Sequence, residues 1–340
     1  MNYEAYDVIT VGSNTIDAFV YTDRVESIST RTLTSQSNFI CYPLGTKLKI
    51  NELGFYTGGG GTNAAVCLSR IGLKTGYIGK TGDDLNGNII LDELKKEKID
   101  FLGVVSKDGQ TGYSVVLDSI ERQRTILTYR GANDNLKAEE IDFKKIKTKW
   151  FHFSAMMQES FKTMEEIAGF ASKNGIKTSF NPNNYMCEKG SNFLKKILIN
   201  LDILILNAEE ASHLIVNDHK DANTDMNMEE KLQILKSLGP KTVIITDGSN
   251  PIYGVDENFN FYTIYPIDIP IIETTGAGDS FASTFLAGII KTNDFVHAIR
   301  LAIANSHSVL GHKGAKNILL NYDELKREIA VNQVRVVKGI

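Results

Sequence analysis

The chain has 340 residues, and its 42% hydrophobic and 23% charged residues are typical of a folded soluble protein with a sizeable core. Its 37 basic and 41 acidic residues give a formal charge of −4, so the chain lacks the basic field that holds a nucleic-acid backbone. The three cysteines, Cys41, Cys67 and Cys187, are widely spaced and odd in number, which argues against a disulfide framework and against a zinc site.

The first 20 residues run into an apolar stretch at 6–11 without a preceding basic segment or a cleavage site. No window holds the roughly 18 consecutive apolar residues that a membrane-spanning helix needs. We therefore expect a cytoplasmic protein that has neither a membrane nor a nucleic acid as its partner.

Short β-branched runs alternate with segments of helical length along most of the chain. Residues 7–11 are typical of a buried strand that ends at Gly12, and residues 63–71 of a helix with one apolar face. Four further apolar runs each precede a polar turn and a helical stretch: 150–153, 177–180, 203–206 and 242–246. This alternation predicts an α/β fold, a parallel sheet with helices on both faces.

Two segments interrupt the alternation. Residues 18–57 are rich in Thr and Ser, and the runs 112–117 and 124–129 flank a polar turn and predict a hairpin. Strands outside the parallel sheet need a packing partner, so we expect a small separate β-sheet that acts as a lid. Residues 217–230 are polar and indicate a loop, and residues 320–340 indicate a solvated tail.

The sequence Thr275-Gly276-Ala277-Gly278-Asp279 precedes an apolar helical run over 282–290. A small-residue turn that opens a helix directs backbone N–H groups outward at the positive end of the helix dipole, where they can bind an anion. A carboxylate in that first turn can accept a proton from an attacking hydroxyl while the amides hold the charge on a phosphoryl group. The alternative is that Asp279 only favours the start of a helix.

A second glycine cluster, residues 58–61, precedes Thr62 and Asn63. Glycines permit a close approach of the backbone to a ligand, and Asn63 offers both a donor and an acceptor to a hydroxyl. The cluster could equally be a hinge. It lacks the Gly-Lys-Ser/Thr of a Walker loop and the spacing of a dinucleotide fingerprint, which weakens the hypothesis of an NAD-dependent oxidoreductase.

The two clusters occur in an order that resembles the PfkB carbohydrate kinase family, the ribokinase-like sugar and nucleoside kinases. Residues 59–72 with 79–87 are similar to its N-terminal signature, and residues 274–279 to its C-terminal one. The resemblance implies a ribokinase-like fold divided as follows: first strand of the main domain 1–17, lid segment 18–57, main domain 58–110, lid hairpin 111–130, main domain with the nucleotide site 131–330, and C-terminal tail 331–340.

The resemblance also implies roles for individual residues. The substrate hydroxyls would be bound by Asp17, Gly59, Gly60 and Asn63. The nucleotide would be contacted by Asn207, Thr246, Gly248 and Thr275, and Mg²⁺ would be placed by Glu210. The anion hole would be formed by Gly276, Ala277 and Gly278, with Asp279 as the catalytic base. Each has a simpler alternative: Asn207 and Glu210, for example, also suit the start of a helix.

Two residues depart from the family pattern. Glu273 stands where the family usually has an Asp linked to a monovalent cation, so we do not expect potassium dependence from the resemblance. Asn181 stands where Asp is common, which removes a charge near the phosphate region and leaves Mg²⁺ placement more dependent on Glu210.

We therefore expect an ATP-dependent phosphotransferase that acts on a hydroxyl of a small sugar. The alternatives are a nucleoside kinase of the same fold and a non-catalytic ligand-binding homologue. An edge strand in 111–130 would favour pairing between two lids, so a homodimer is the working expectation.

Overall fold

The computed structural model describes residues 5–23, 25–31, 36–118, 124–216, 226–312 and 314–339. Within these residues one large sheet has the strand order β18-β17-β16-β15-β14-β13-β12-β1-β6-β8. Its bounds are β1 Tyr6–Val11, β6 Thr75–Ile78, β8 Asp100–Phe101, β12 Thr148–Ser154, β13 Lys177–Asn181, β14 Ile203–Asn207, β15 Thr242–Thr246, β16 Ile252–Val255, β17 Phe261–Tyr265 and β18 Arg335–Lys338.

The strands from β15 to β8 are parallel, as the sequence predicts, whereas β16, β17 and β18 join one edge antiparallel. The sheet is therefore mixed. Strands covered on both faces should be apolar almost throughout, and β1 follows this rule because Val8, Ile9 and Val11 are apolar and fully buried. The connections from β15 to β16 and from β16 to β17 are short. These strands therefore pair as consecutive antiparallel neighbours, because a parallel pair would need a longer crossover connection.

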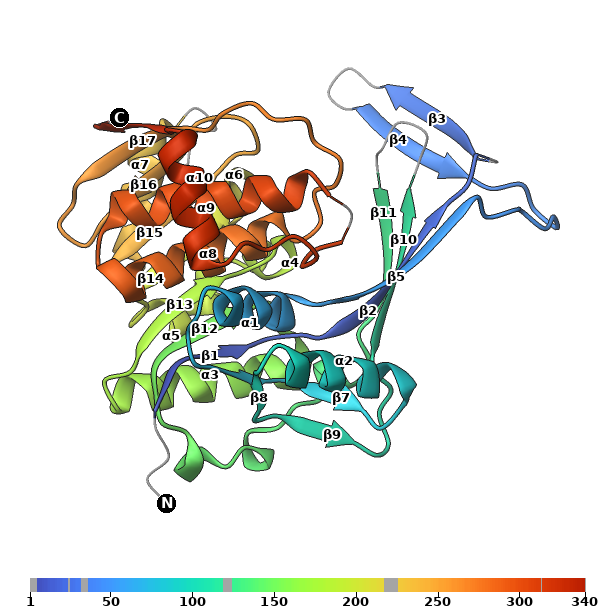
Figure 1. The fold of residues 1–340 in the computed structure, drawn as a ribbon, viewed down its shortest axis with the longest axis horizontal. Coiled ribbons are helices and arrows are strands. Elements are labelled where there is room, and N and C mark those ends of the chain that lie inside the picture. The colour runs from blue at the N-terminus through green and yellow to red at the C-terminus, as the bar shows by residue number, and fades with distance from the viewer. Residues whose placement is uncertain are drawn as a thin grey trace.

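Helices cover both faces of this sheet (Figure 1). One hydrophobic core contains side chains of α1 (Gly60–Arg70), α2 (Leu85–Lys96), α8 (Ala277–Thr292), α9 (Phe295–Leu310) and α10 (Tyr322–Val331). The other contains side chains of α3 (Gln158–Lys173), α4 (Asn184–Cys187), α5 (Ser191–Leu198), α6 (Ala208–Val216) and α7 (Met228–Ser237). The prediction of an α/β fold with helices on both faces is confirmed.

A four-stranded sheet with the order β11-β10-β2-β5 leaves the main body, and we call it the lid (Figure 1). Its strands are β2 (Thr15–Tyr21), β5 (Glu52–Gly58), β10 (Gly112–Asp118) and β11 (Arg124–Tyr129). The hairpin of β3 (Glu26–Arg31) and β4 (Gln36–Cys41) extends beyond it, and β7 (Lys80–Gly82) pairs with β9 (Val104–Ser106). The expected hairpin of 112–117 and 124–129 is confirmed as β10 and β11, while its tip at 119–123 lies outside the described residues.

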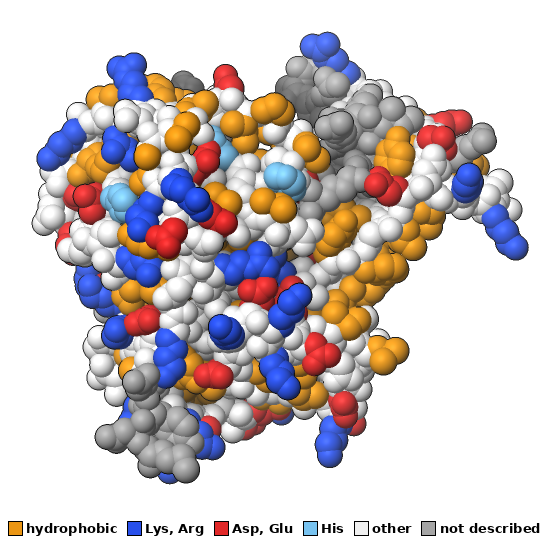
Figure 2. Space-filling model, viewed as in Figure 1, with side chains coloured by type: hydrophobic (Ala, Val, Ile, Leu, Met, Phe, Trp, Pro, Cys, Tyr) orange, Lys and Arg blue, Asp and Glu red, His pale blue; other side chains and the backbone are white. Residues whose placement is uncertain are grey.

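One face of the lid is apolar and open to solvent. Its exposed side chains include Leu53 and Phe55 of β5 and Leu127 and Tyr129 of β11. Figure 2 shows hydrophobic side chains gathered along this part of the molecule. A contiguous exposed apolar patch marks a surface that binds another molecule or a second copy.

Two predictions near the C-terminal half are wrong. Residues 320–340 were expected as a solvated tail, but they contain α10 and β18, and β18 pairs with β17. The segment differs from a solvated tail because α10 is amphipathic: Leu325 is fully buried while charged residues of the helix lie on its outer side. The loop expected over 217–230 ends earlier, because Asn227 caps α7 and the helix begins at Met228; residues 217–225 lie outside the described residues.

Candidate active site

The two glycine clusters of the sequence meet in space. Asn63 on α1 donates a hydrogen bond from Nδ2 to Asp279 Oδ2 on α8, at 2.7 Å, although 216 positions separate them in the chain. Both side chains belong to the first turn or two of their helices, so the positive ends of α1 and α8 lie at the same place. The structure therefore brings Asn63 and Asp279 together as one site.

The turn before α8 requires glycine at one position. Gly276 is the N-cap residue and has a left-handed backbone with φ of 83°. A Cβ atom there would lie 2.4 Å from Ala315 Cβ, which is too close for any side chain. A Cβ on Gly278 would meet no atom within 4 Å, so Gly278 faces open space. The turn is thus packed on one side and open on the other, as an anion hole requires.

The side chain of Asp279 is partly exposed, but the surrounding protein desolvates its carboxyl group. Burial raises the pKa of Asp279 above its ordinary value, and the negative charge of Asp17 adds to this. The hydrogen bond from Asn63 and the charge of Lys316 act in the opposite direction and lower it. A carboxyl with a raised pKa is a stronger proton acceptor, which suits a general base.

Asp17 lies on lid strand β2 and is buried. Thr15 Oγ1 donates a hydrogen bond to Asp17 Oδ1 at 2.9 Å. A Cβ on Gly58 would lie 2.0 Å from Asp17 Oδ2, so glycine at 58 leaves the space that the carboxylate occupies. Burial raises the pKa of Asp17, and hydrogen bonds from Thr15 and Ser114 lower it. Because the charge of Asp17 raises the pKa of Asp279, the two carboxyls belong to one electrostatic environment.

Two polar atoms beside Asp279 lack a hydrogen-bond partner among the described residues: Asn63 Oδ1 and Ser154 Oγ. Both residues are buried, at 6% and 2% exposure. A Cβ placed on Gly60 would be 3.2 Å from both Asp279 Oδ1 and Ser154 Oγ. Gly60, Asp279 and Ser154 therefore border the same small space. Buried polar atoms are nearly always paired, and these two are therefore available to a ligand.

Sequence reasoning missed Ser154. The one signal that could have found it is its position, because it ends the predicted strand over 150–153 at the carboxyl edge of the sheet. Ligands of open α/β sheets bind outside that edge.

A cavity of about 320 Å³ lies next to the start of α8. It is lined by the predicted residues Asn207, Thr246, Gly248, Ala277 and Gly278, together with apolar residues that the sequence analysis did not assign. These include Ile267, Ile271, Phe281, Ile303 and Leu310. An apolar cavity with a few polar groups at one end suits a heterocyclic base with its phosphates near a helix N-terminus. Thr275 is not among the lining residues.

Asn207 and Glu210 form a reciprocal cap at the start of α6. Asn207 N donates to Glu210 Oε2 and Glu210 N donates to Asn207 Oδ1, both at 2.8 Å. Burial raises the pKa of Glu210 to about 7, and the charges of Glu209 and Asp279 add to the effect. The pair therefore has the structural role of a helix cap, and the carboxylate lies within electrostatic range of Asp279. No group of three or more His, Cys, Asp or Glu side chains in the described part of the chain could hold a metal ion by itself.

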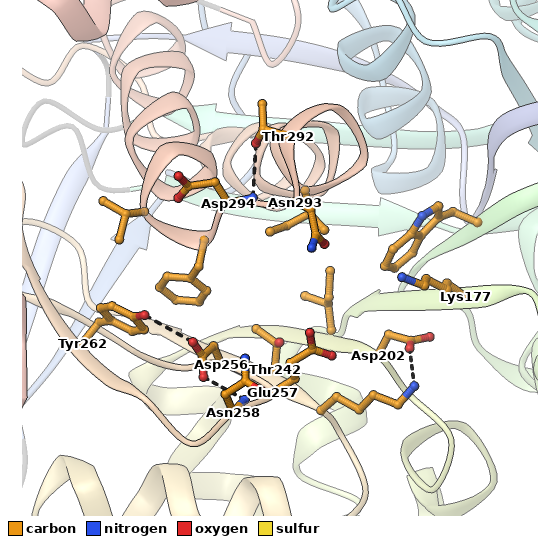
Figure 3. Close-up of a pocket in the computed structure, with 16 residues that line it drawn as sticks. Lys177, Asp202, Thr242, Asp256, Glu257, Asn258, Tyr262, Thr292, Asn293 and Asp294 are labelled. Carbon is orange, nitrogen blue, oxygen red and sulfur yellow. Dashed lines mark hydrogen bonds and ion pairs between the residues drawn. The ribbon is translucent and has the colours of Figure 1, made fainter.

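A larger cavity, of about 540 Å³, lies at the opposite edge of the sheet (Figure 3). It surrounds the amino ends of β12 to β15 and contains none of the residues that the sequence motifs predict. Four of its polar residues form two pairs: Lys241 Nζ donates to Asp202 Oδ1 at 2.7 Å, and Tyr262 OH donates to Asp256 Oδ2 at 3.2 Å. The candidate site is therefore the carboxyl edge, despite its smaller cavity.

Comparison with known proteins identifies the family of the chain. Residues 28–321 match the family model described as pfkB family carbohydrate kinase. The chain belongs to this family. The sequence is 28% identical over 240 residues to a protein of Archaeoglobus fulgidus described as an uncharacterized sugar kinase, covering 69% of this chain and 90% of that protein.

Solved structures show the same fold as this PfkB kinase. The ribokinase of Arabidopsis thaliana, complexed with ribose and ATP, superposes with a TM-score of 0.79 at 20% identity, over 96% of this chain and 99% of that one. The nucleoside kinase of Methanocaldococcus jannaschii gives a TM-score of 0.76 at 20% identity, over 97% and 100% of the two chains. The resemblance seen in the signatures is thus confirmed, and the protein is a sugar or nucleoside kinase of the PfkB family. In the described part of the chain no helix is long and apolar enough to span a membrane.

Proposed function

We propose that this PfkB kinase transfers the γ-phosphoryl group of ATP to a hydroxyl of a small sugar, with Asp279 as the base. The observation that carries the proposal is the position of Asp279. It directly follows Ala277 and Gly278, which line the cavity, and its carboxylate accepts a hydrogen bond from Asn63 and lies beside Ser154, so a nucleotide and a hydroxyl could meet there.

The substrate would lie under the lid, with hydroxyls bound by Asp17 and by the unpaired Asn63 Oδ1. The glycines at 59 and 60 allow a close approach, and Ser154 Oγ offers one further donor or acceptor. Sugars are recognised through such convergent polar atoms, because every hydroxyl that leaves water needs a partner.

In the transfer, the substrate oxygen attacks the γ-phosphorus and forms the new P–O bond. Its proton passes to Asp279, the bond from the γ-phosphorus to the bridging oxygen breaks, and ADP leaves. The backbone N–H groups of 276–278 would stabilise the charge on the phosphoryl oxygens at the start of α8.

ATP would occupy the cavity beside α8, with its base against Ile267, Ile271 and Phe281 and its phosphates toward Gly278. Mg²⁺, when bound, neutralises phosphate charge. Glu210 and Asn207 are the residues that would place it. In this structure Glu210 Oε2 and Asn207 Oδ1 each accept a hydrogen bond from the backbone N–H of the other residue.

The exposed apolar face of the lid, with Leu53, Phe55 and Leu127, supports a homodimer through the lid. Light scattering during gel filtration tests this: the wild type should elute as a dimer and Phe55→Lys as a monomer. A monomeric wild type would contradict the dimer and leave the kinase proposal intact.

ADP release from ATP and Mg²⁺ should be measured across pentoses, hexoses, their monophosphates and nucleosides. We expect turnover with one member of the sugar set. Turnover with a nucleoside instead would favour the nucleoside kinase. Binding of ATP with no turnover on the whole panel would favour a non-catalytic homologue.

A further inference from the structure

A lysine is buried next to the candidate active site. Lys316 is 3% exposed, and its Nζ forms an ion pair with Glu93 Oε2 of α2 at 2.6 Å. Lysine is almost never fully buried unless it is paired, because removing an ammonium group from water is costly. Neither the sequence motifs nor the implied roles account for this residue.

Lys316 connects four parts of the site. Its carbonyl oxygen accepts a hydrogen bond from Arg70 Nη1 of α1 at 2.7 Å. Its partner Glu93 accepts a hydrogen bond at Oε1 from Thr57 Oγ1 of lid strand β5, at 2.5 Å. The preceding residue, Ala315, packs directly against Gly276, the N-cap of α8. The lid, α1, α2 and the anion-hole turn therefore meet at one side chain and its backbone.

The charge of Lys316 also reaches the reactive carboxyls. It lowers the pKa of Asp17 on β2 and of Asp279 on α8, against the larger effect of burial on each. The other titratable groups that interact with Asp279 are Asp17, Glu210 on α6 and Cys67 on α1. In the described part of the chain, Lys316 is the cation whose charge acts on both Asp17 and Asp279.

We propose that Lys316 is a positioning residue of the active site, which holds the turn at 276–278 against lid strand β5 and supplies the buried positive charge of that site. The proposal rests on the proposed function, since Asp279 must be the base for its ionisation to matter. A buried ion pair with a purely structural role would stabilise the fold without changing the titration of Asp279.

The first test is the pH dependence of kcat in Lys316→Met. Loss of the cation raises the pKa of Asp279, so the acid limb should move to higher pH, by about 0.5 unit or more. Lys316→Arg keeps the charge and should restore the limb. If Lys316→Met fails to fold with Glu93 unpaired, the double variant Lys316→Met/Glu93→Gln removes both charges and should show the same shift.

The chain offers a matched control. Lys80 is 7% exposed and pairs with Glu140 Oε1 at 2.6 Å, so Lys80→Met removes a comparable buried ion pair. Its acid limb should stay at the wild-type pH. An unshifted limb in Lys316→Met, or an equal shift in Lys80→Met, would overturn the proposal.

A second test does not require turnover. The Asp279 carboxyl carbon can be titrated by NMR in protein labelled with ¹³C-aspartate, and its signal assigned from its loss in Asp279→Asn. We expect its pKa to rise in Lys316→Met and to stay unchanged in Lys80→Met. A shift in a protein that has no kinase activity would refute the proposed function alone. An unchanged Asp279 titration in an active enzyme would refute the role of Lys316 alone.

Discussion

The two edges of the main sheet differ in a way that cavity size does not reveal. The amino edge has the larger cavity, yet several of its polar groups are satisfied within it, as Asp256 is by Tyr262 (Figure 3) and Asp202 by Lys241. The carboxyl edge has a smaller cavity, two carboxyls with raised pKa values, and unpaired atoms on Asn63 and Ser154. Polar groups left unpaired and carboxyls held away from their ordinary pKa identify a functional site better than empty volume.

After substitution of the proposed base Asp279, the largest fall in kcat should follow from Gly276→Ala. A methyl group would collide with Ala315 and displace the turn that we propose binds the phosphoryl oxygens. Loss of one such donor set lowers kcat by about 10²- to 10³-fold. Steady-state ADP release measures this. The control is Gly169→Ala on α3, where a Cβ meets no atom within 4 Å and kcat should not change.

Asp17→Asn should act on substrate binding. The change removes a charged acceptor, and a hydrogen bond to a charged group contributes about 1.5–3 kcal/mol, so KM for the sugar should rise roughly 10- to 100-fold. KM for ATP should stay close to that of the wild type. An increase confined to KM for ATP would show that Asp17 acts on nucleotide binding and not on sugar binding.

We expect Glu210 to give the activity a pH dependence. Its pKa is raised to about 7, so the carboxylate is ionised above that pH and protonated below it. Since Mg²⁺ prefers the ionised form, the Mg²⁺ concentration for half-maximal activity should be about tenfold higher at pH 6 than at pH 8. Glu210→Gln should lose this part of the pH dependence. If the ratio of the half-maximal Mg²⁺ concentrations at pH 6 and pH 8 were the same in the wild type and the variant, Glu210 would have no role in placing Mg²⁺.

The smallest effect is expected at the amino edge. Lys241 pairs with Asp202, but its side chain is 60% exposed, so the pair is screened by water. Lys241→Ala should lower the free energy of unfolding by less than about 1 kcal/mol and leave kcat unchanged. Urea denaturation and ADP release test the two parts. A large fall in kcat would mean that the amino-edge cavity contributes to function.

The fold and the pair of glycine motifs could be predicted because they depend on local patterns. The buried strands and the turn at 276–279 carry their signal within a few residues. The edge strand β18 could not be predicted in the same way, since its partner in the sheet, β17, lies far away in the chain. The burial of Lys316 could not be predicted either, because a lone lysine after Gly314 and Ala315 gives no sign that it will form a buried ion pair with Glu93.

The contact between Asn63 and Asp279 is an intermediate case. Each residue could be singled out from its glycine cluster, and the family resemblance implied that both belong to one active site. The 2.7 Å hydrogen bond between them, and the unpaired Asn63 Oδ1 that it leaves, required the structure.

The central claim is that Asp279 accepts the proton of the attacking hydroxyl, and Asp279→Asn tests it most directly. Turnover of the best substrate and calorimetric binding of ATP should be measured on the same preparation. The account predicts that kcat falls by about 10²- to 10⁴-fold, because a general base contributes that much, while the Kd of ATP stays nearly unchanged. A variant that keeps its turnover would show that Asp279 is not the base.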